Sequence, residues 1–312
     1  MSANAVQPVF AHIAAGRSSG LAAWDWGLLL LPAAAVLLWW HGRGVLRLWR
    51  RAGVGHGIER WRVASFAAGV VCVCVALVGP MDDGAARSFA LHMTQHMMLV
   101  LIAAPLIVLG TPVVPLLAGA PRDVRGGVVR WRRTRSGRRL LRALTDPPTT
   151  LALYGGMLLF WHIPSVYDAT LSNGALHASE HTLLLATATL SWWVLLAPRR
   201  QRRLGYGAAV LFVFALMLEC TALGGLFTLA PRPLYSGYAN TQALFGMSPE
   251  HDQQVGGAIM GTLAAAVYLS TAATLFLRWL GESPADRSGR RARLAPPMAA
   301  LPYQHPGGEQ RG

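Results

Sequence analysis

Lysine is absent from this 312-residue chain, and cysteine is scarce, with only three residues. Cys72, Cys74 and Cys220 all lie inside apolar runs, which argues against a disulfide framework. Cys72 and Cys74 are two residues apart, so on a helix they would point to nearly opposite faces. Packing among small apolar groups therefore explains this pair better than a shared thiolate metal site does.

Several nucleotide-binding and catalytic motifs are missing as well. The sequence contains no Walker phosphate-binding loop, no dinucleotide-binding glycine pattern after a strand, and no His-Glu-x-x-His motif. These absences argue against an ATP-driven pump and against an intramembrane zinc protease.

Apolar residues and positive charge dominate the composition. The chain is 53% apolar, yet it carries 28 basic residues and a formal net charge of +14. Such a charge can indicate a nucleic-acid-binding protein. Here, however, the arginines cluster in short segments between long apolar runs, which is typical of a multi-pass membrane protein and argues against nucleic acid as a partner.

Seven apolar runs predict membrane-spanning helices. They cover approximately residues 24–40, 63–79, 88–110, 149–162, 176–197, 205–229 and 251–279. The expected fold is therefore an all-α membrane protein, a bundle of seven transmembrane helices over residues 23–280. An extracytoplasmic lead (1–22) precedes the bundle, and a tail rich in Pro, Gly and Arg (281–312) is expected to be disordered in the cytoplasm.

The distribution of arginine predicts the orientation of this bundle. Almost every Arg lies after the first, third, fifth or seventh run, whereas the N-terminal lead and the other links hold only Arg17, Arg87 and Arg232. The positive-inside rule then places the N-terminus outside and the C-terminus in the cytoplasm. Part of the most basic segment, residues 122–142, is expected to form an amphipathic helix on anionic headgroups.

This orientation brings six of the ten histidines to one layer at the outer membrane face. They are the i,i+4 pairs His92/His96 and His177/His181 on the third and fifth runs, His162 at the end of the fourth run, and His251 at the start of the seventh. Each pair lies on one face of its helix, and imidazoles from two such faces suit one or two late first-row metal ions. Met93 and Met97 each follow a histidine of the first pair by one residue, and their thioethers favour copper. The alternative is an interhelical hydrogen-bond layer in which Met fills packing gaps.

Three of the carboxylates in the apolar runs are candidates for a functional role. Glu180 and Asp252 lie at the level of the histidines, where they can accept a proton from a ligating imidazole or offset the charge of a helix N-terminus. Glu219 lies deep in the sixth run, beside Cys220. An ionisable group at that depth is a functional candidate, and a protonated, hydrogen-bonded carboxyl is the alternative.

Three segments carry a family resemblance: HMTQHMMLVLIAAPLIVLGTP, WHIPSVYDATLSNGALHASEHTLLL and SPEHDQQVGGAIM. In this order they resemble the signature segments of the CtaG-type cytochrome c oxidase assembly proteins of the caa3 oxidase class. The resemblance implies a multi-pass protein of the bacterial plasma membrane that helps to form a heme-copper oxidase, at the stage of copper delivery or insertion. Its implied partners are oxidase subunits or a copper chaperone, and no catalytic turnover is implied.

The matching positions are His92, Gln95, His96, Met97, Trp161, His162, Pro164, Tyr167, His177, Glu180, His181, Asp252, Gln253 and Gln254. Among them we expect Gln95, Glu180, Asp252 and Tyr167 to surround and orient the metal ligands. The resemblance does not assign the ligands themselves, so the metal site depends on the histidine chemistry.

Two other functions are compatible with the sequence. A membrane metalloenzyme with a dimetal histidine-box centre would use the two His-x-x-x-His pairs, although such enzymes generally contain adjacent histidines on the cytoplasmic side. A copper transport or tolerance protein would need ligands at successive depths, and the inner half offers only His41 and His56 besides Glu219 and the cysteines.

Overall fold

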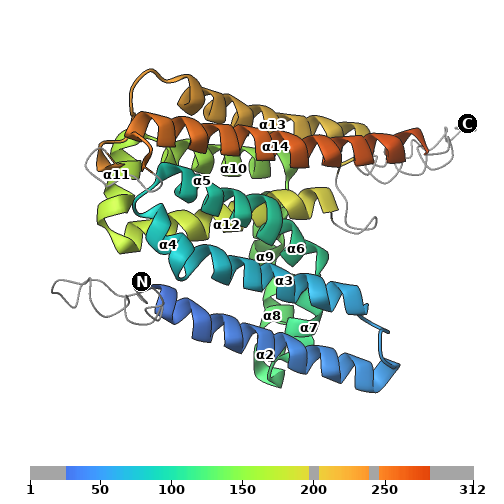
Figure 1. Cartoon of the computed structure of the whole chain (residues 1–312). Coiled ribbons are helices and arrows are strands. Elements are labelled where there is room, and N and C mark those ends of the chain that lie inside the picture. The colour runs from blue at the N-terminus through green and yellow to red at the C-terminus, as the bar shows by residue number, and fades with distance from the viewer. Residues whose placement is uncertain (1–25, 197–203, 239–245, 282–312) are drawn as a thin grey trace, which may run out of the picture.

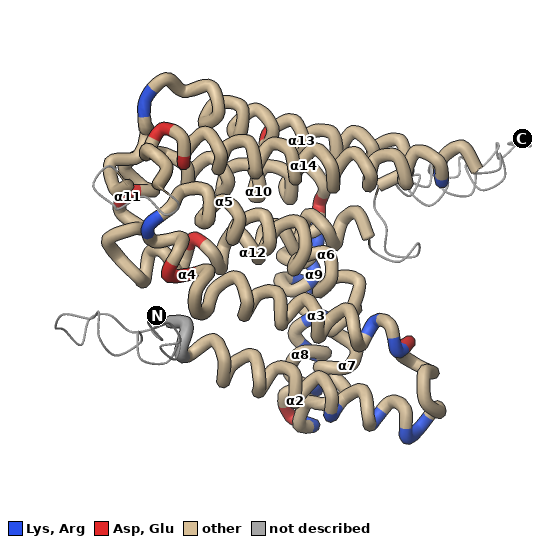
Figure 2. The backbone as a smooth tube through the Cα atoms, viewed as in Figure 1, with Lys and Arg blue, Asp and Glu red and all other residues tan. Residues whose placement is uncertain are grey.

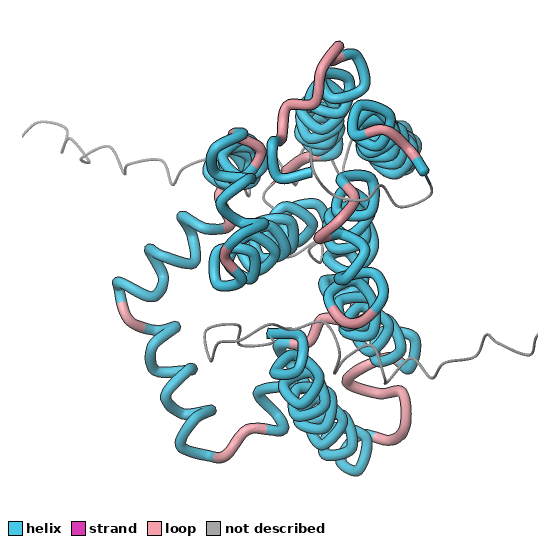
Figure 3. Tube along the Cα trace, turned by 60° about the vertical axis from the view of Figure 1, so that its left-hand side comes forward, coloured by secondary structure: helices cyan, strands magenta, loops and turns pink. Residues whose placement is uncertain are grey.

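The computed structural model describes residues 26–196, 204–238 and 246–281. The predicted N-terminal lead (1–22), the arginines between 199 and 203, and nearly all of the predicted tail (281–312) lie outside the described residues. Within the described residues every regular element is a helix and none is a strand (Figure 3).

The long helices are α2 (Trp26–Ala52), α3 (Arg60–Leu77), α10 (Pro147–Trp161), α12 (Gly174–Leu196), α13 (Tyr206–Leu229) and α14 (Pro249–Leu280). A composite helix consists of α5 (Phe89–Met97), the π-helical η1 (Met98–Ala103) and α6 (Ala104–Leu109). The shorter elements are α4 (Pro80–Ala85), α7 (Val113–Gly119), α8 (Arg122–Arg133), α9 (Arg135–Leu144), α11 (Pro164–Ser172) and the 3₁₀ turn η2 (Ser236–Tyr238).

Five of the described helices are long and apolar enough to cross a membrane. They are Leu29–Ala52, Arg60–Leu77, Phe89–Leu109, Tyr206–Leu229 and Pro249–Leu280. The all-helical prediction is confirmed, and several apolar helices agree with a multi-pass membrane protein. The predicted fourth and fifth spans correspond to α10 and α12, which are not among these five, so the count of seven remains a prediction.

The helices pack side by side in a bundle (Figure 1). Helix α14 contacts both α13 and α5, α12 contacts α10 and α6, and α3 contacts η1 and α6, while α2 packs against α3 and α7 at one side. The main apolar core lies among α5, α10, α12, α13 and α14. This arrangement places the first turns of α5 and α12 next to the end of α10.

Some predicted boundaries were wrong, chiefly because helices continue through polar residues. Helix α2 runs on to Ala52, so Arg43 and Arg47 lie on a helix and not in a loop. Arg47 is held there because its guanidinium donates to the carbonyl oxygens of Ala118 and Gly119 at the end of α7, at 2.8 and 2.9 Å. His41 also lies inside α2, where its buried ring packs on Phe66 with the ring centroids 4.3 Å apart.

Charge is segregated between the two ends of the bundle. Figure 2 shows acidic residues mainly where α4, α11 and the start of α14 lie, and basic residues mainly at the opposite end and along α8 and α9. Both of these basic segments are helical, and they expose the apolar side chains of Val124, Trp131 and Leu140 as well as their arginines. Residues 122–142 therefore form two amphipathic helices in place of the partly helical loop that the sequence predicts.

The third apolar run contains a π-helical segment, Met98–Ala103, and Pro105 follows shortly after it. In a π-helix each N–H bonds to the carbonyl five residues earlier, and Pro105 has no N–H to offer to Val100. The indole Nε1 of Trp192 on α12 donates to the Val100 oxygen instead, at 2.8 Å. The helix defect is thus satisfied by a side chain from the neighbouring helix, which ties α12 to the composite helix.

Glycines allow the close crossing of α13 and α14. A Cβ atom at Gly257 would lie 2.6 Å from the carbonyl oxygen of Gly224, and one at Gly224 would lie 2.7 Å from the oxygen of Gly257. Gly257 and Gly261 form a Gly-x-x-x-Gly pair, the pattern that lets membrane helices approach to backbone contact. Side chains at either crossing position would push these helices apart.

Candidate metal centre

Helix caps set the depth of the two histidine pairs. The Ser88 hydroxyl accepts from the N–H of Leu91 at 3.3 Å and begins α5, so His92 and His96 fall in its first turns. The side-chain amide oxygen of Asn173 accepts from the N–H groups of Ala175 and Leu176 in the same way at the start of α12. His177 and His181 therefore occupy the first turns of α12, at the level of the first pair.

The rings of the two pairs converge. The centroids of His92 and His181 are 5.4 Å apart, and those of His96 and His181 are 5.2 Å apart. His177 adjoins His92 at 5.2 Å. His162 follows α10, which ends before Pro164, and its ring lies 5.7 Å from that of His96. Five imidazoles from three helices thus form one connected group.

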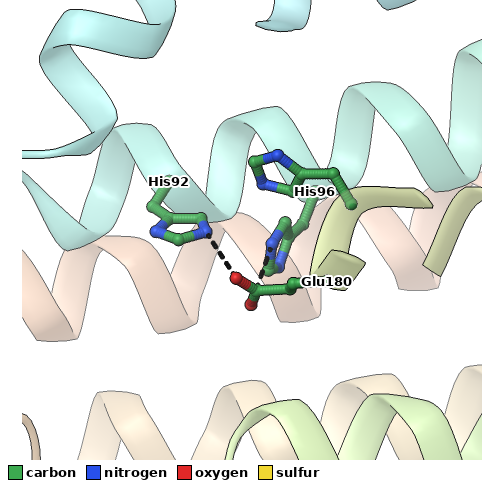
Figure 4. A group of neighbouring side chains, drawn as sticks. His92, His96 and Glu180 are labelled. Atoms are coloured by element: carbon green, nitrogen blue, oxygen red, sulfur yellow. Dashed lines mark ion pairs between the residues drawn. The ribbon is translucent and has the colours of Figure 1, made fainter. Parts of the chain in front are cut away.

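Glu180 lies in the middle of this group, between His92 and His96 (Figure 4). The Nε2 atom of His92 is 3.8 Å from Glu180 Oε2, and the Nε2 atom of His96 is 3.5 Å from Glu180 Oε1. One donor atom from each of His92, His96, Glu180 and His181 lies within 4.8 Å of the other three, as expected for groups that can hold a metal ion. All four side chains are buried.

In the five histidines and Glu180, the side-chain atoms that could bind a metal have no hydrogen-bond partner among the described residues. They are Nε2 of His92, His162, His177 and His181, both ring nitrogens of His96, and both carboxylate oxygens of Glu180. Buried polar atoms in folded proteins are almost always paired, and each unpaired one costs about 1–3 kcal/mol. A concentration of them on nitrogen and carboxylate oxygen is what an ion-binding site presents before the ion is bound.

Hydrogen bonds from outside the group fix which nitrogen of His92 carries the proton. The Tyr238 hydroxyl donates its hydrogen to the carbonyl oxygen of Ala85 at 3.1 Å, so it accepts from His92 Nδ1 at 3.1 Å and from the Tyr167 hydroxyl at 3.0 Å. Burial raises the pKa of Tyr238, which keeps this hydroxyl protonated. With the proton on Nδ1, the lone pair of His92 Nε2 points to the Glu180 side and is available to a metal.

His162 is oriented in the same way by the main chain. Its Nδ1 donates to the carbonyl oxygen of Leu158 at 2.7 Å, because a carbonyl can only accept. The Nε2 atom then carries a lone pair, is buried, and has no partner among the described residues. A hydrogen bond from the second ring nitrogen to a carbonyl is a common support for metal-binding histidine.

The structure places some predicted residues elsewhere. His251 is exposed on the first turn of α14 and is not among the buried histidines. Asp252, one residue on, points to α5, where it accepts from the Ser88 hydroxyl at 2.6 Å and from the N–H of Phe89 at 2.6 Å. The carboxylate therefore caps a helix N-terminus, which was the alternative role, and is not hydrogen-bonded to a histidine ring.

Gln95 also faces away from the group. Its Nε2 donates to the carbonyl oxygen of Ala76 at 2.7 Å and to Asp82 Oδ1 at 3.1 Å, which ties α5 to α3 and α4. Met93 and Met97 are buried in the main apolar core, consistent with the packing alternative. Tyr167, by contrast, does support the group, through Tyr238.

Glu219 lies in a separate place on α13. Its carboxylate packs against Gly155 of α10, where a Cβ atom would come within 2.5–2.6 Å of its two oxygens. Neighbouring Cys220 is fully buried beside Tyr154, with Sγ 4.0 Å from the hydroxyl. None of these residues belongs to the histidine group.

Two tyrosines in the link before α14 have a role at the histidine group that the sequence analysis did not predict. Tyr238 orients His92, and the Tyr235 hydroxyl donates to the carbonyl oxygen of His162 at 3.1 Å. Asp168 holds this link in place by accepting from the N–H groups of Ser236 and Gly237. The two tyrosines are remote in sequence from the histidines that they contact, by 146 residues for Tyr238 and His92 and by 73 for Tyr235 and His162, so no spacing rule connects them.

Comparison with known proteins gives relatives of the chain in mycobacteria. Uncharacterised proteins of Mycobacterium leprae (strain TN) and Mycobacterium bovis (strain ATCC BAA-935 / AF2122/97) are 25% and 24% identical to it over 265 and 283 residues. These alignments cover 82% and 87% of this chain but only 39% and 42% of the relatives, so the chain spans about two fifths of their length. No solved structure matches the chain.

A family model matches residues 28–282, which include all the helices that form the histidine group. Its description is the cytochrome c oxidase caa3 assembly factor, Caa3_CtaG. The family resemblance of the three sequence segments is thereby confirmed. The chain belongs to the caa3 cytochrome c oxidase assembly factor family.

Proposed function

We propose that this protein binds copper at the His/Glu group and delivers it during assembly of a heme-copper oxidase. The observation that carries the proposal is the set of buried imidazole nitrogens around Glu180 that have no hydrogen-bond partner among the described residues. Family membership supplies the assembly role. The oxidase subunits or a copper chaperone are the proposed partners.

Copper is favoured by the donor chemistry. Imidazole suits copper, zinc, iron and nickel, and among divalent first-row ions copper binds a given nitrogen and oxygen site most tightly. None of the three cysteines belongs to the group, so its donors are imidazole and carboxylate only. His177 is the partly exposed member of the group, and we assign it as the first ligand that incoming copper meets.

The proposed topology has seven spans with the histidine group at the extracytoplasmic face. Helices α10 and α12 are the two additional spans, and their packing within the bundle supports this. The basic helices α8 and α9 then lie on the cytoplasmic side, as the positive-inside rule requires. Enzyme reporters fused after residue 134 and after residue 173 should report the cytoplasm and the outside, respectively; the reverse result would contradict the topology.

Metal analysis of the purified protein, combined with oxidase activity in a deletion strain, tests the function. The His92→Ala/His96→Ala variant should bind much less copper and fail to restore oxidase activity, whereas the His251→Ala control should behave as the unmodified protein. Excess copper in the medium should partly restore activity in the deletion strain if delivery is the role. Unchanged copper binding in the double variant would contradict the proposal.

One observation favours a second candidate, a dimetal membrane enzyme. Two His-x-x-x-His pairs surround one carboxylate, Glu180, and a histidine-box dimetal centre would use such pairs. Iron in place of copper after purification, together with oxygen consumption by the iron-loaded protein, would support the enzyme over copper delivery.

A further inference from the structure

The histidine group holds more metal-binding side chains than one ion of ordinary coordination number uses. Five imidazoles and one carboxylate present buried atoms without hydrogen-bond partners among the described residues. A zinc or copper ion in a nitrogen-rich site takes about three or four protein ligands. A single ion would therefore leave at least two buried side chains unsatisfied, and unsatisfied buried polar atoms are destabilising.

Glu180 divides these side chains into two sets. Its Oε2 faces Nε2 of His92 at 3.8 Å, and its Oε1 faces Nε2 of His96 at 3.5 Å. Two ligand atoms that share a tetrahedral ion at about 2.0–2.1 Å lie roughly 3.3 Å from each other. Each oxygen–nitrogen pair is therefore spaced nearly as required to share an ion, and the two pairs use different oxygens of one carboxylate, as a bridging carboxylate does.

The outer histidines are positioned to complete one set each. Two imidazoles bound to one tetrahedral ion have ring centroids roughly 5 Å apart, given a metal–nitrogen distance of about 2.0 Å. The centroid of His177 lies 5.2 Å from that of His92, and the centroid of His162 lies 5.7 Å from that of His96. His181 adjoins both sets, at 5.4 Å from His92 and 5.2 Å from His96.

We propose that the centre binds two copper ions bridged by Glu180, one with His92 and His177 and the other with His96 and His162. This inference rests on the proposed copper function and goes beyond it in the number of ions and the division of the ligands. His181 contacts both sets and serves either ion. Two-metal sites usually place their ions about 3.5–4 Å apart, a separation that one carboxylate can bridge.

Copper stoichiometry of the purified full-length protein in detergent tests the division of ligands. After loading with copper and removal of unbound metal, the unmodified protein should retain two ions per chain. The His96→Ala/His162→Ala and His92→Ala/His177→Ala variants should each retain one, and the variant with all four substitutions none. The exposed His251→Ala control should retain two.

Electron paramagnetic resonance of the same samples after oxidation provides a readout independent of stoichiometry. Two bridged Cu(II) ions couple, so the integrated signal of the unmodified protein should fall well below two spins per chain. Each one-copper variant should give one full spin. If an alanine variant does not match the elution volume and circular dichroism of the unmodified protein, the corresponding glutamine variant, which preserves more of the side-chain volume, is measured instead.

The outcomes separate this inference from the function on which it rests. One copper per unmodified chain, with little loss in the His162→Ala and His177→Ala single variants, would overturn the two-ion centre and leave copper delivery standing. An unmodified chain that binds no copper would overturn both. Two uncoupled copper ions would overturn the bridging role of Glu180.

Discussion

The Nε2 atom of His96 lies 3.5 Å from Oε1 of Glu180, and the two side chains are 1% and 0% exposed. A hydrogen bond between nitrogen and oxygen would bring these atoms to about 2.7–3.2 Å. They are instead separated nearly as two ligands of one metal ion are. The close approach of a buried carboxylate and a buried imidazole without a hydrogen bond supports the proposed ion between them.

Replacing Glu180 by Gln tests the carboxylate directly. The amide keeps the shape of the side chain but removes the negative charge and one oxygen. Loss of a group that only supports a ligand costs about 10–100-fold in metal affinity, so loss of this proposed ligand should lower copper affinity by at least about tenfold. Competition with a coloured copper chelator measures this affinity. The matched control is Glu250→Gln on the exposed first turn of α14. An equal loss of copper affinity in this control would contradict the assignment of Glu180 as a copper ligand.

Replacing Tyr238 by Phe tests the orientation of His92. Without the hydroxyl, His92 Nδ1 loses its acceptor, the tautomer is no longer fixed, and copper affinity should fall by roughly 10–100-fold. The number of ions bound should not change, because no ligand has been removed. Tyr154→Phe removes a hydroxyl from a separate buried pair and should leave affinity unchanged.

Replacing Asp252 by Ala tests the helix cap. Three donors lose their acceptor: the Ser88 hydroxyl and the N–H groups of Phe89 and Ala90. We expect the free energy of unfolding to fall by about 1–3 kcal/mol, seen as a lower midpoint in thermal unfolding of the detergent-solubilised protein. Glu250→Ala, in the same helical turn but exposed, should shift the midpoint far less.

A double-mutant cycle tests the account of the π-helical segment. Trp192→Phe leaves the Val100 carbonyl oxygen without a donor and should cost about 1–3 kcal/mol. Pro105→Ala restores a main-chain N–H that can donate to the Val100 carbonyl oxygen. The Trp192→Phe substitution should therefore destabilise the protein less in the Pro105→Ala background. Additive effects of the two substitutions on unfolding would show that the two groups do not share this carbonyl.

Replacing Gly257 by Val tests the crossing of α13 and α14. The new side chain would clash with the Gly224 carbonyl oxygen, so the two helices must move apart. We expect the free energy of unfolding to fall by about 1–3 kcal/mol. Gly225→Val, on the same helix as Gly224 but with open space around its Cβ position, is the control. Equal stability of the two variants would contradict the close crossing.

Much of the fold follows from the sequence because apolar length and arginine placement are local properties. The predicted runs at residues 88–110, 205–229 and 251–279 match helices to within two residues at each end. The extent of α2 was not predictable in this way, since Arg43 and Arg47 look like loop residues until α7 supplies carbonyl acceptors for one of them. The link at residues 164–172 is helical for a similar reason, since tertiary packing decides whether a short polar segment forms a helix.

The spacing of the histidines by itself determined that each pair shares a helix face, and the caps at Ser88 and Asn173 set both pairs at one depth. The tertiary structure alone decided that the two faces meet, that Glu180 lies between them, and that Asp252 turns to a helix end while His251 stays exposed. The physical reason is that sequence period fixes the direction of a side chain only relative to its own helix axis. The rotation of α5, α10 and α12 about those axes is set by packing among residues far apart in the chain, and the same packing brings Tyr238 to His92.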